Sequence, residues 1–289
     1  MRKVNNSTPL LTVCLITYNH VNHISSAIEG ILSQKTSFQI HLVIADDFSV
    51  DGTRAILSEY KEKHPDLITL ILQKENVGPE KNWLDLISYP DSEYIAYIEG
   101  DDYWTDPYKL QKQVEQMRRI GSVISFTGHY KEYNGHKGLN SIRSRTFGIE
   151  EFILKGRNTL PVCSSSTVYR NIKGAVEDFT KNFIGAPNGD FPFFAILLSY
   201  GNGFFLEDTT LVHRLNEGVS SRFNWETIYQ TRIPVLCFLL ERKKNEDIAG
   251  FLKKELRKYY WLYGLTLLKR GRVFTGFRYI ISCLAIWLK

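Results

Sequence analysis

The stretch Leu11–Thr53, LTVCLITYNHVNHISSAIEGILSQKTSFQIHLVIADDFSVDGT, contains two short apolar runs with an amphipathic segment between them. The runs Leu11–Thr17 and Ile40–Ala45 are rich in β-branched and aliphatic residues, as is typical of buried strands. The intervening segment has apolar residues at helical spacing, at Ile24, Ile28, Ile31 and Leu32. This order predicts a strand, a helix and a second strand, the unit from which parallel sheets are built.

The same alternation continues as far as residue 127. Further strands are predicted at Ile68–Leu72, Tyr94–Ile98 and Ser122–Thr127. Helical spacing recurs between them, at Ile56, Leu57 and Tyr60, then Trp83, Leu84 and Ile87, then Leu110, Val114 and Met117. We therefore expect an α/β fold with a mainly parallel sheet flanked by helices. Ligands of such sheets bind beyond the carboxyl ends of the strands.

The rest of the chain divides into a mixed region and a helical one. The polar stretch Tyr130–Arg145 predicts a loop or a hairpin edge, Ser164–Arg170 a strand, and Phe191–Tyr200 a helix. After about Asn224 the pattern is helical throughout, with aromatic and basic residues interleaved. We expect one domain over residues 1–223 and a helical extension over residues 224–289.

Composition limits the class of protein. Hydrophobic residues make up 43% of the chain and aromatic residues 13%, which suffices for a packed core. The net charge of +5 is uneven, because residues 226–289 contain 13 Lys and Arg against 5 Asp and Glu. The four cysteines are widely spaced, which argues against structural zinc. The N-terminal residues lack a signal-peptide pattern, so we expect a cytosolic catalytic body.

Polar clusters follow three of the predicted strands. The first strand ends in Thr17–His20, the second in Asp46–Ser49 followed by Asp51, and the fourth in Glu99–Trp104. All three should meet at one edge of the sheet. The residues after the second strand alone leave two interpretations open, a ligand site or a turn with a helix cap.

The fourth strand carries the strongest signal. Glu99, Asp101 and Asp102 place three carboxylates within four residues, directly after an apolar strand. Their mutual repulsion is unfavourable unless a cation offsets it. Mg²⁺ and Mn²⁺ prefer oxygen ligands and are often shared between carboxylates and substrate phosphates. Gly100 allows close approach of a ligand to the backbone. These residues predict a divalent metal site.

Four segments together resemble a known family. VCLITYNH, VIADDFSVDGT, ENVGPEKNW and YIEGDDYWTDPYKLQKQ are similar, in order and spacing, to family-2 glycosyltransferases with the GT-A fold. The resemblance covers residues 10–220 and is greatest to bacterial enzymes of surface-polysaccharide assembly, such as those of O-antigen, capsule or lipopolysaccharide. It implies inverting transfer of a sugar from a nucleotide-diphosphate donor, with a UDP-sugar favoured, to an acceptor hydroxyl.

The resemblance also implies roles for single residues on the donor side. Thr17, Tyr18 and Asn19 would bind the nucleotide, and Asp46 would accept a hydrogen bond from its base. Lys81 stands where the family often has a basic residue near the nucleotide.

The family's acidic DxD metal motif appears here as Glu99-Gly100-Asp101 followed by Asp102. Asp101 would face the ribose or the sugar, and Asp102 would bind Mg²⁺ or Mn²⁺. Because Glu99 replaces the usual first Asp, it stays open which of the three carboxylates bonds the cation directly.

Two later segments complete the expected site. Asp190 follows a glycine and precedes an apolar helix, so the residues alone allow either a general base or a helix cap. The segment resembles the family's GD-aromatic-Pro stretch, which implies that Asp190 is the catalytic base. Arg214, in a segment similar to the family's YR-x-H, would bind the diphosphate. His213 takes the usual Tyr position and Asn216 the usual His position, so no metal role is assigned to this histidine.

The tail contains three apolar stretches separated by basic residues, Ile233–Leu240, Trp261–Leu268 and Val273–Leu288. The last stretch includes Arg278, and its 16 residues are too few for a spanning helix. We expect it to dock on an anionic membrane, placing the protein peripherally on the inner face of the cell membrane near a saccharide or lipid-linked saccharide acceptor. The alternative is packing on the domain or on another subunit.

Other classes fit less well. A dinucleotide-binding dehydrogenase requires GxGxxG after the first strand, where this chain has TYNHVNH. A nucleic-acid partner is not expected, because the basic residues of the tail lie among long apolar runs. A catalytically silent nucleotide-sugar- or membrane-binding scaffold with the same fold remains the alternative to an enzyme.

Overall fold

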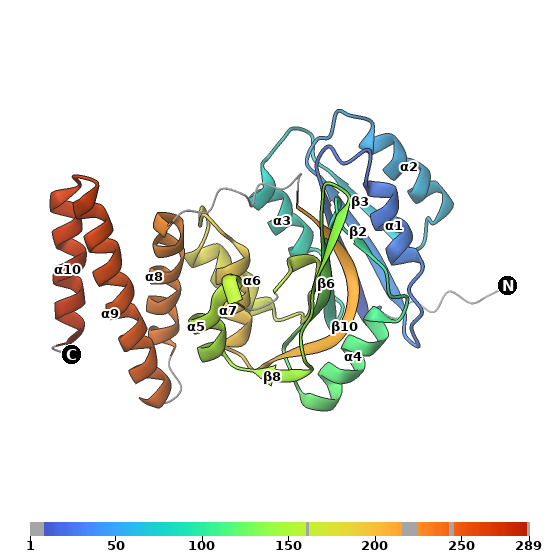
Figure 1. Cartoon of the computed structure of the whole chain (residues 1–289). Coiled ribbons are helices and arrows are strands. Elements are labelled where there is room, and N and C mark those ends of the chain that lie inside the picture. Colours follow the sequence, from blue (N-terminus) through green and yellow to red (C-terminus); the bar gives the residue numbers. More distant parts are fainter. Residues whose placement is uncertain (1–8, 160–161, 216–224, 243–245, 288–289) are drawn as a thin grey trace.

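The structure is a computed structural model that describes residues 9–159, 162–215, 225–242 and 246–287 (Figure 1). Its central strand β1 (Leu11–Thr17) lies between β2 (Ile40–Asp46) and β4 (Tyr94–Glu99), and β3 (Ile68–Leu72) lies beyond β2. All of these neighbours pair in parallel. The four predicted strands and their parallel arrangement are confirmed.

The other half of the sheet is mixed. β9 (Val168–Arg170) pairs antiparallel with both β4 and β6 (Ile124–Tyr133), and β6 pairs in parallel with β10 (Gly203–Arg214). Shorter strands complete it, namely β5 (Tyr103–Trp104), β7 (His136–Asn140) and β8 (Arg145–Phe147). The β6–β7 hairpin realises one of the two interpretations of residues 130–145. The strand predicted at Ser164–Arg170 is shorter, because its three serines form the 3₁₀ turn η1 (Ser164–Ser166).

Helices cover both faces of the sheet (Figure 1). One face carries α1 (Ile24–Leu32), α2 (Thr53–Lys63) and α4 (Lys109–Ile120), and the opposite face carries α3 (Pro79–Ser88), α5 (Ile149–Thr159), α6 (Lys173–Asn182) and α7 (Asp190–Leu198). Successive side chains of β1 point to opposite faces of the sheet and so contribute to two apolar cores. Val13 and Leu15 pack on the α1 side, and Cys14 packs on the other side. The layered α/β architecture therefore follows from the strand pattern.

The C-terminal helices stack outward in chain order from the α5–α7 layer (Figure 1). α8 (Trp225–Glu241) packs on α7, α9 (Glu246–Lys269) on α8, and α10 (Val273–Trp287) on α9. α8 and α9 share the apolar core of α5–α7, as their buried residues Leu236, Leu256 and Leu267 show. In the described part of the chain, none of the helices is both long and apolar enough to cross a membrane.

Candidate active site

The strand register brings the predicted polar clusters to one edge of the sheet. Thr17 of β1 is paired with Asp46 of β2, and Ile16 of β1 is paired with Glu99 of β4. Three neighbouring parallel strands therefore end at the same level. The polar residues that follow them surround one site, as expected for the carboxyl edge of such a sheet.

The three acids after β4 form a compact cluster. Carboxylate oxygens of Glu99, Asp101 and Asp102 lie within 4.8 Å of one another. Asp102 is fully buried and Asp101 is 4% exposed. The tight geometry requires Gly100, because a Cβ there would lie 2.7 Å from His20 Nδ1 and 2.8 Å from Thr17 Oγ1. The backbone is thus folded so that the carboxylates converge.

This convergence is electrostatically unfavourable without a ligand. Burial and the charges of Asp102 and Asp101 raise the pKa of Glu99 to about 8. Burial and the charge of Asp102 also raise the pKa of Asp101. Among the described residues, only His213 forms an ion pair with any of these acids. The three acids and the imidazole fit a divalent ion such as Mn²⁺ or Mg²⁺, which accepts such oxygen-rich sets.

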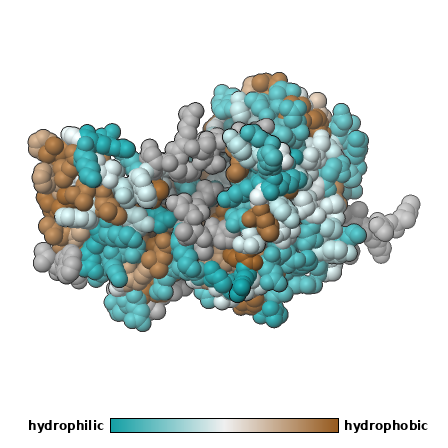
Figure 2. Space-filling view, in the orientation of Figure 1, coloured by the Kyte–Doolittle hydropathy of each residue, from teal (hydrophilic) through white to brown (hydrophobic). Residues whose placement is uncertain are grey.

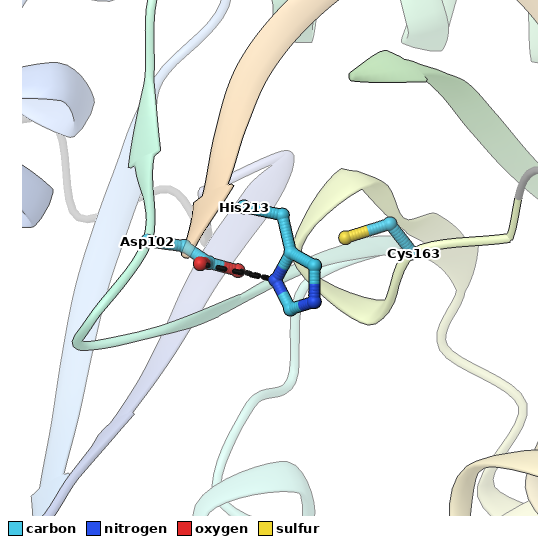
Figure 3. Close-up of side chains that lie close together, drawn as sticks. All are labelled: Asp102, Cys163 and His213. Carbon is cyan, nitrogen blue, oxygen red and sulfur yellow. Dashed lines mark hydrogen bonds and ion pairs between the residues drawn. The ribbon is translucent and has the colours of Figure 1, made fainter. Parts of the chain in front are cut away.

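Asp102 also contacts residues that follow it by more than 100 positions. The Nδ1 atom of His213 lies 3.0 Å from Asp102 Oδ2 and 3.1 Å from Oδ1, and the Arg214 backbone N–H donates to Oδ1 at 2.9 Å. Cys163 places its sulfur in the same group of possible ligands, facing the His213 ring (Figure 3). Burial disfavours the charged ring, but the hydrogen bond and charge of Asp102 outweigh it and raise the pKa of His213.

Sequence reasoning missed His213 and Cys163 as neighbours of the acids. His213 lies beside the acids because β10 pairs with β5, which places Val212 opposite Tyr103. Cys163 lies there because η1, which it precedes, packs against β4. Neither contact has a local spacing pattern that could have predicted it.

Arg214 lies beside the acids without neutralising their carboxylates. Its Nη1 donates to the backbone carbonyl of Asp101 at 2.6 Å, and its Nε lies 3.4 Å from a carboxylate oxygen of Glu132. The guanidinium also stacks over the ring of Tyr103, 4.5 Å from its centroid. This planar cation is held at the edge of the acidic cluster, a position suited to phosphate oxygens.

The loop after β2 has internal partners for Asp46. The Ser49 hydroxyl donates to Asp46 Oδ1, while the Ser49 backbone N–H at 3.0 Å and Arg54 Nε at 2.5 Å donate to Oδ2. Asn19 joins this loop to the first one, since its Oδ1 accepts the Val50 N–H at 2.9 Å. Asp46 and Asn19 therefore fix the loops.

Two aromatic rings are exposed at these loops. Tyr18 is 45% exposed and Phe48 is 39% exposed. They provide an apolar surface beside the fixed loops, on which a flat ring system could stack.

Lys81 occupies a different position from the acids. It lies on α3 and forms an ion pair with Asp85 one turn later, and its side chain is 60% exposed. The structure therefore records no contact between Lys81 and the acidic cluster.

Asp190 is the first residue of α7, and Gly189 takes the N-cap position. The helix-cap interpretation of Asp190 is therefore wrong. Its Oδ2 accepts a hydrogen bond from the Ser164 hydroxyl. The two side chains line a small cavity together with Trp83, Tyr97, Tyr169, Phe193 and Phe194.

The Asp190 carboxylate lies near the acidic cluster. Burial raises the pKa of Tyr97, and the charges of Glu99 and Asp190 raise it further. The charge of Asp190 also contributes to the raised pKa of Glu99. Asp190 and the three acids after β4 therefore influence one another electrostatically.

The fold, with acids at the carboxyl edge of its sheet, is that of the GT-A class. Residues 12–172, more than half of the chain, match the model of the glycosyl transferase family 2. The chain belongs to this family, and the resemblance inferred from its motifs is confirmed.

Several relatives share part of this region. The chain is 32% identical over 126 residues to the putative teichuronic acid biosynthesis glycosyltransferase TuaG of Bacillus subtilis, covering 44% of this chain and 49% of TuaG. It is 30% identical over 128 residues to the Escherichia coli UDP-Glc:alpha-D-GlcNAc-diphosphoundecaprenol beta-1,3-glucosyltransferase WfgD, covering 44% of this chain and 48% of WfgD. An uncharacterized protein of Mycobacterium tuberculosis, Rv1520, is 42% identical over 109 residues, covering 38% of this chain and 32% of that protein. The aligned part thus spans 32–49% of the length of these relatives.

Solved structures agree in fold. Staphylococcus aureus TarS (residues 1–349) in complex with UDP-GlcNAc superposes with a TM-score of 0.66 at 17% identity, covering 87% of this chain and 71% of that one. The mannosyltransferase PcManGT of Pyrobaculum calidifontis, in complex with GDP-Man and Mn²⁺, gives 0.59 at 16% identity, covering 97% and 76%. At these identities the likeness establishes the fold alone.

Proposed function

We propose that this protein is a metal-dependent, inverting glycosyltransferase that moves a sugar from a nucleotide-diphosphate donor to an acceptor hydroxyl in bacterial surface-polysaccharide biosynthesis. The observation that carries the proposal is the buried cluster of Glu99, Asp101 and Asp102 at the carboxyl edge of the sheet. Burial and mutual repulsion raise the pKa of Glu99 and Asp101, and a bound cation would relieve this repulsion.

On the donor side, Asp102 and His213 would hold Mg²⁺ or Mn²⁺, with Asp101 and Glu99 beside them. When bound, the ion would stabilise negative charge on the leaving diphosphate. Arg214 offers a planar cation for the same phosphates. The donor's base would lie near Thr17, Tyr18 and Asn19, beside the loop that Asp46 holds through Ser49 and Arg54. Lys81, exposed on α3, stays a proposed nucleotide contact. A uridine nucleotide is the favoured donor, and the TarS and WfgD names both include UDP-linked sugars.

On the acceptor side, Asp190 acts as the general base. Inverting transfer requires removal of the acceptor's hydroxyl proton as its oxygen attacks the anomeric carbon. Asp190 stands at the start of α7 and lines a small cavity with Ser164 and Tyr97. Its charge contributes to the raised pKa of Glu99, which supports a position close to a donor sugar held at the acids.

The acceptor class follows from the tail and the relatives. A saccharide carried on a lipid would be presented at the inner face of the cell membrane, where the basic helices α9 and α10 could dock. The name of WfgD describes an acceptor sugar on diphosphoundecaprenol. We therefore propose a saccharide or lipid-linked saccharide acceptor and a peripheral location on an anionic membrane surface.

A thermal-shift panel tests the proposal. UDP-, GDP- and dTDP-sugars are added with Mn²⁺, with Mg²⁺ or with a chelator, since a ligand that binds the native state raises the unfolding temperature. One nucleotide class should raise it, and only when the metal is present. The absence of any metal-dependent nucleotide shift would contradict the proposal. Metal-dependent binding without donor turnover on any saccharide acceptor would favour the silent scaffold.

A further inference from the structure

Helix α10 has two unlike faces. One face packs on α9, where Gly276 and Cys283 are buried and the ring of Tyr279 lies 4.7 Å from that of Tyr263. The crossing is close, because a Cβ on Gly276 would lie 2.9 Å from the carbonyl oxygen of Gly264. This contact fixes which side of α10 is turned away from the protein.

The side that is turned away is apolar. Phe274, Phe277, Ile281 and Leu284 are 94%, 53%, 63% and 55% exposed. Their spacing of three, four and three residues places them in one stripe along the helix. Figure 2 shows the hydrophobic surface gathered at the end of the molecule formed by α10 and α9. A contiguous apolar stripe of this kind marks a contact surface.

The segment that carries the stripe is rich in cations. Arg278 lies on α10 itself and is exposed. The described part of α9, its connection to α10 and α10 contain eight cations and three acids, namely Lys253, Lys254, Arg257, Lys258, Lys269, Arg270, Arg272 and Arg278 against Glu246, Asp247 and Glu255. Three of these cations have acidic partners, because Arg270 and Arg272 pair with Glu226 of α8 and Lys258 pairs with Glu255. The segment still has an excess of positive charge. This combination complements an anionic lipid surface, in which apolar side chains enter the acyl boundary and cations contact headgroups.

We propose that the stripe of Phe274, Phe277, Ile281 and Leu284 is the surface by which the protein lies on an anionic bilayer. α10 then rests in the headgroup region parallel to the membrane, and α9 and α8 connect it to the catalytic layers. The described part of α10, 15 residues long, is not long and apolar enough to cross a membrane. The assignment rests on the membrane location given in the proposed function and names the residues that would produce it.

Flotation of the full chain with vesicles tests this assignment. Vesicles of phosphatidylcholine alone are compared with vesicles that also contain phosphatidylglycerol. The double substitution Phe277→Ser with Ile281→Ser should lower partitioning onto the anionic vesicles by about tenfold or more. Leu154→Ser is the matched control, because Leu154 is equally exposed at 55% but lies on α5. Arg278→Gln should cause a smaller loss and weaken the salt dependence.

Two outcomes would overturn the assignment. In one, the double variant floats as well as the wild type. In the other, the wild type ignores both vesicles and self-associates through this stripe in sedimentation velocity, which would make a second copy the occupant. Donor binding measured on the same samples separates the proposals. If the wild type binds donor but not vesicles, only the docking assignment is contradicted. If it binds vesicles but not donor, only the proposed transferase function is contradicted.

A second, independent observation concerns the turn η1, which joins the two halves of the site. The Glu99 backbone N–H donates to Ser165 Oγ at 3.1 Å, and Trp104 Nε1 donates to the Ser165 carbonyl at 2.9 Å. One residue earlier, the Ser164 hydroxyl donates to Asp190 Oδ2. A single buried turn therefore contacts both the strand that bears the acids and the helix that bears the proposed base.

We infer that Ser164 is a positioning residue that fixes the orientation of the Asp190 carboxylate relative to the acidic cluster. The inference rests on the proposed role of Asp190. Ser164 is 4% exposed, so water cannot readily replace its hydroxyl as a donor. An incorrectly oriented base lowers turnover and leaves donor binding unchanged.

Ser164→Ala should lower kcat by about tenfold to a hundredfold without changing the donor's Kd. Ser164→Thr, which keeps a hydroxyl, should restore part of the rate. Ser166→Ala is the control, because its hydroxyl bonds the Cys163 carbonyl in the same turn. Adding Ser164→Ala to Asp190→Asn should cost little more, since both act through one group. An unchanged kcat in Ser164→Ala, or equal losses in the two alanine variants, would overturn the inference. Full activity of Asp190→Asn would instead remove the proposed base.

Discussion

The carboxyl edge of the sheet buries charged side chains, whereas the outer face of α10 exposes apolar ones. At the sheet edge, Asp101 and Asp102 are buried beside Glu99. On α10, Phe274 is almost fully exposed. Folded proteins normally pair buried charges and cover large apolar side chains. Each region therefore has the chemistry of a binding site. The sheet edge suits a cation and phosphates, and the face of α10 suits a lipid surface.

The two regions also differ in how the rest of the chain supports them. The acids are held by three parallel strands, by Gly100 and by contacts from β10 and η1, so their geometry is set from several directions. The α10 stripe depends on a single helix–helix contact with α9. Substitutions at the edge should affect chemistry with an intact fold, whereas substitutions near α10 should affect docking or local stability.

The largest effect is expected for Asp102→Asn. The side chain keeps its size and its contact with the Arg214 N–H, but it loses the charge that would hold the ion. Metal stabilisation of a leaving group contributes several kcal/mol, so metal-dependent transfer should fall by about four orders of magnitude. Initial rates with Mn²⁺ measure this, and circular dichroism checks the fold. Asp91→Asn, at an exposed acid paired with Lys173, should be neutral. Wild-type rates in Asp102→Asn would contradict the metal assignment. The buried acids would then no longer indicate a ligand site.

Asp190→Asn should have a smaller effect on the same reaction. Loss of a general base costs about 10²- to 10⁴-fold in rate, of which we expect about a thousandfold here. Because the acids after β4 remain, titration calorimetry should still show nucleotide binding in the presence of Mn²⁺. Loss of nucleotide binding together with turnover would mean that Asp190 acts through the structure of α7.

Local sequence patterns predicted most of the parallel half of the sheet. Leu11–Thr17 and Ile68–Leu72 match their strands to the residue, and a polar segment follows each apolar run. The strand predicted at Ser122–Thr127 begins two residues later, at Ile124, and extends to Tyr133, because its second half pairs with β7. Boundaries set by pairing with a distant segment cannot be read from local composition.

The candidate site shows the same limit. The acids after β4 could be predicted because three carboxylates after a buried strand conflict with local physics. The partners of those acids could not, since His213 reaches Asp102 only through pairing between β10 and β5. Likewise, Arg54 of α2 donates a hydrogen bond to Asp46, and Ser164 of η1 donates one to Asp190. Tertiary contacts decide these roles.

Substitution of Gly264 tests the support of α10. A Cβ there would lie 2.9 Å from the Gly276 carbonyl oxygen, so Gly264→Ala should separate α9 from α10 and lower the free energy of unfolding by about 1–3 kcal/mol. Gly250→Ala is the matched control on the same helix, since nothing lies within 4 Å of its Cβ. It should raise stability by about 0.5–1 kcal/mol through helix propensity. Urea unfolding measures both. Donor affinity should not change in either variant, and a loss in Gly264→Ala would show that the two regions are coupled.

The last prediction concerns Lys109, a buried lysine of α4 that has its own internal partners. It is fully buried, its Nζ donates to Gln113 Oε1 at 2.7 Å, and it lies 4.4 Å from the centroid of the Trp104 ring. Burial lowers the pKa of Lys109 to about 7. The unfolded chain keeps a lysine pKa of about 10.4, so between about pH 7 and pH 10 it binds more protons than the native state. The contribution of this residue to stability therefore rises with pH across that window.

Lys109→Met should remove this dependence. The free energy of unfolding of the wild type should gain on that of the variant by up to about 1.4 kcal/mol per pH unit between about pH 7 and pH 9. Lys112→Met is the control one turn along α4, because hydrogen bonds with Asp106 and Asp208 raise the pKa of Lys112 and leave it charged in both states over this range. Urea unfolding at several pH values gives the two slopes. Parallel slopes for wild type and Lys109→Met would mean that the Lys109 ammonium is retained without penalty, and a buried charge in this layer would then no longer indicate a missing ligand.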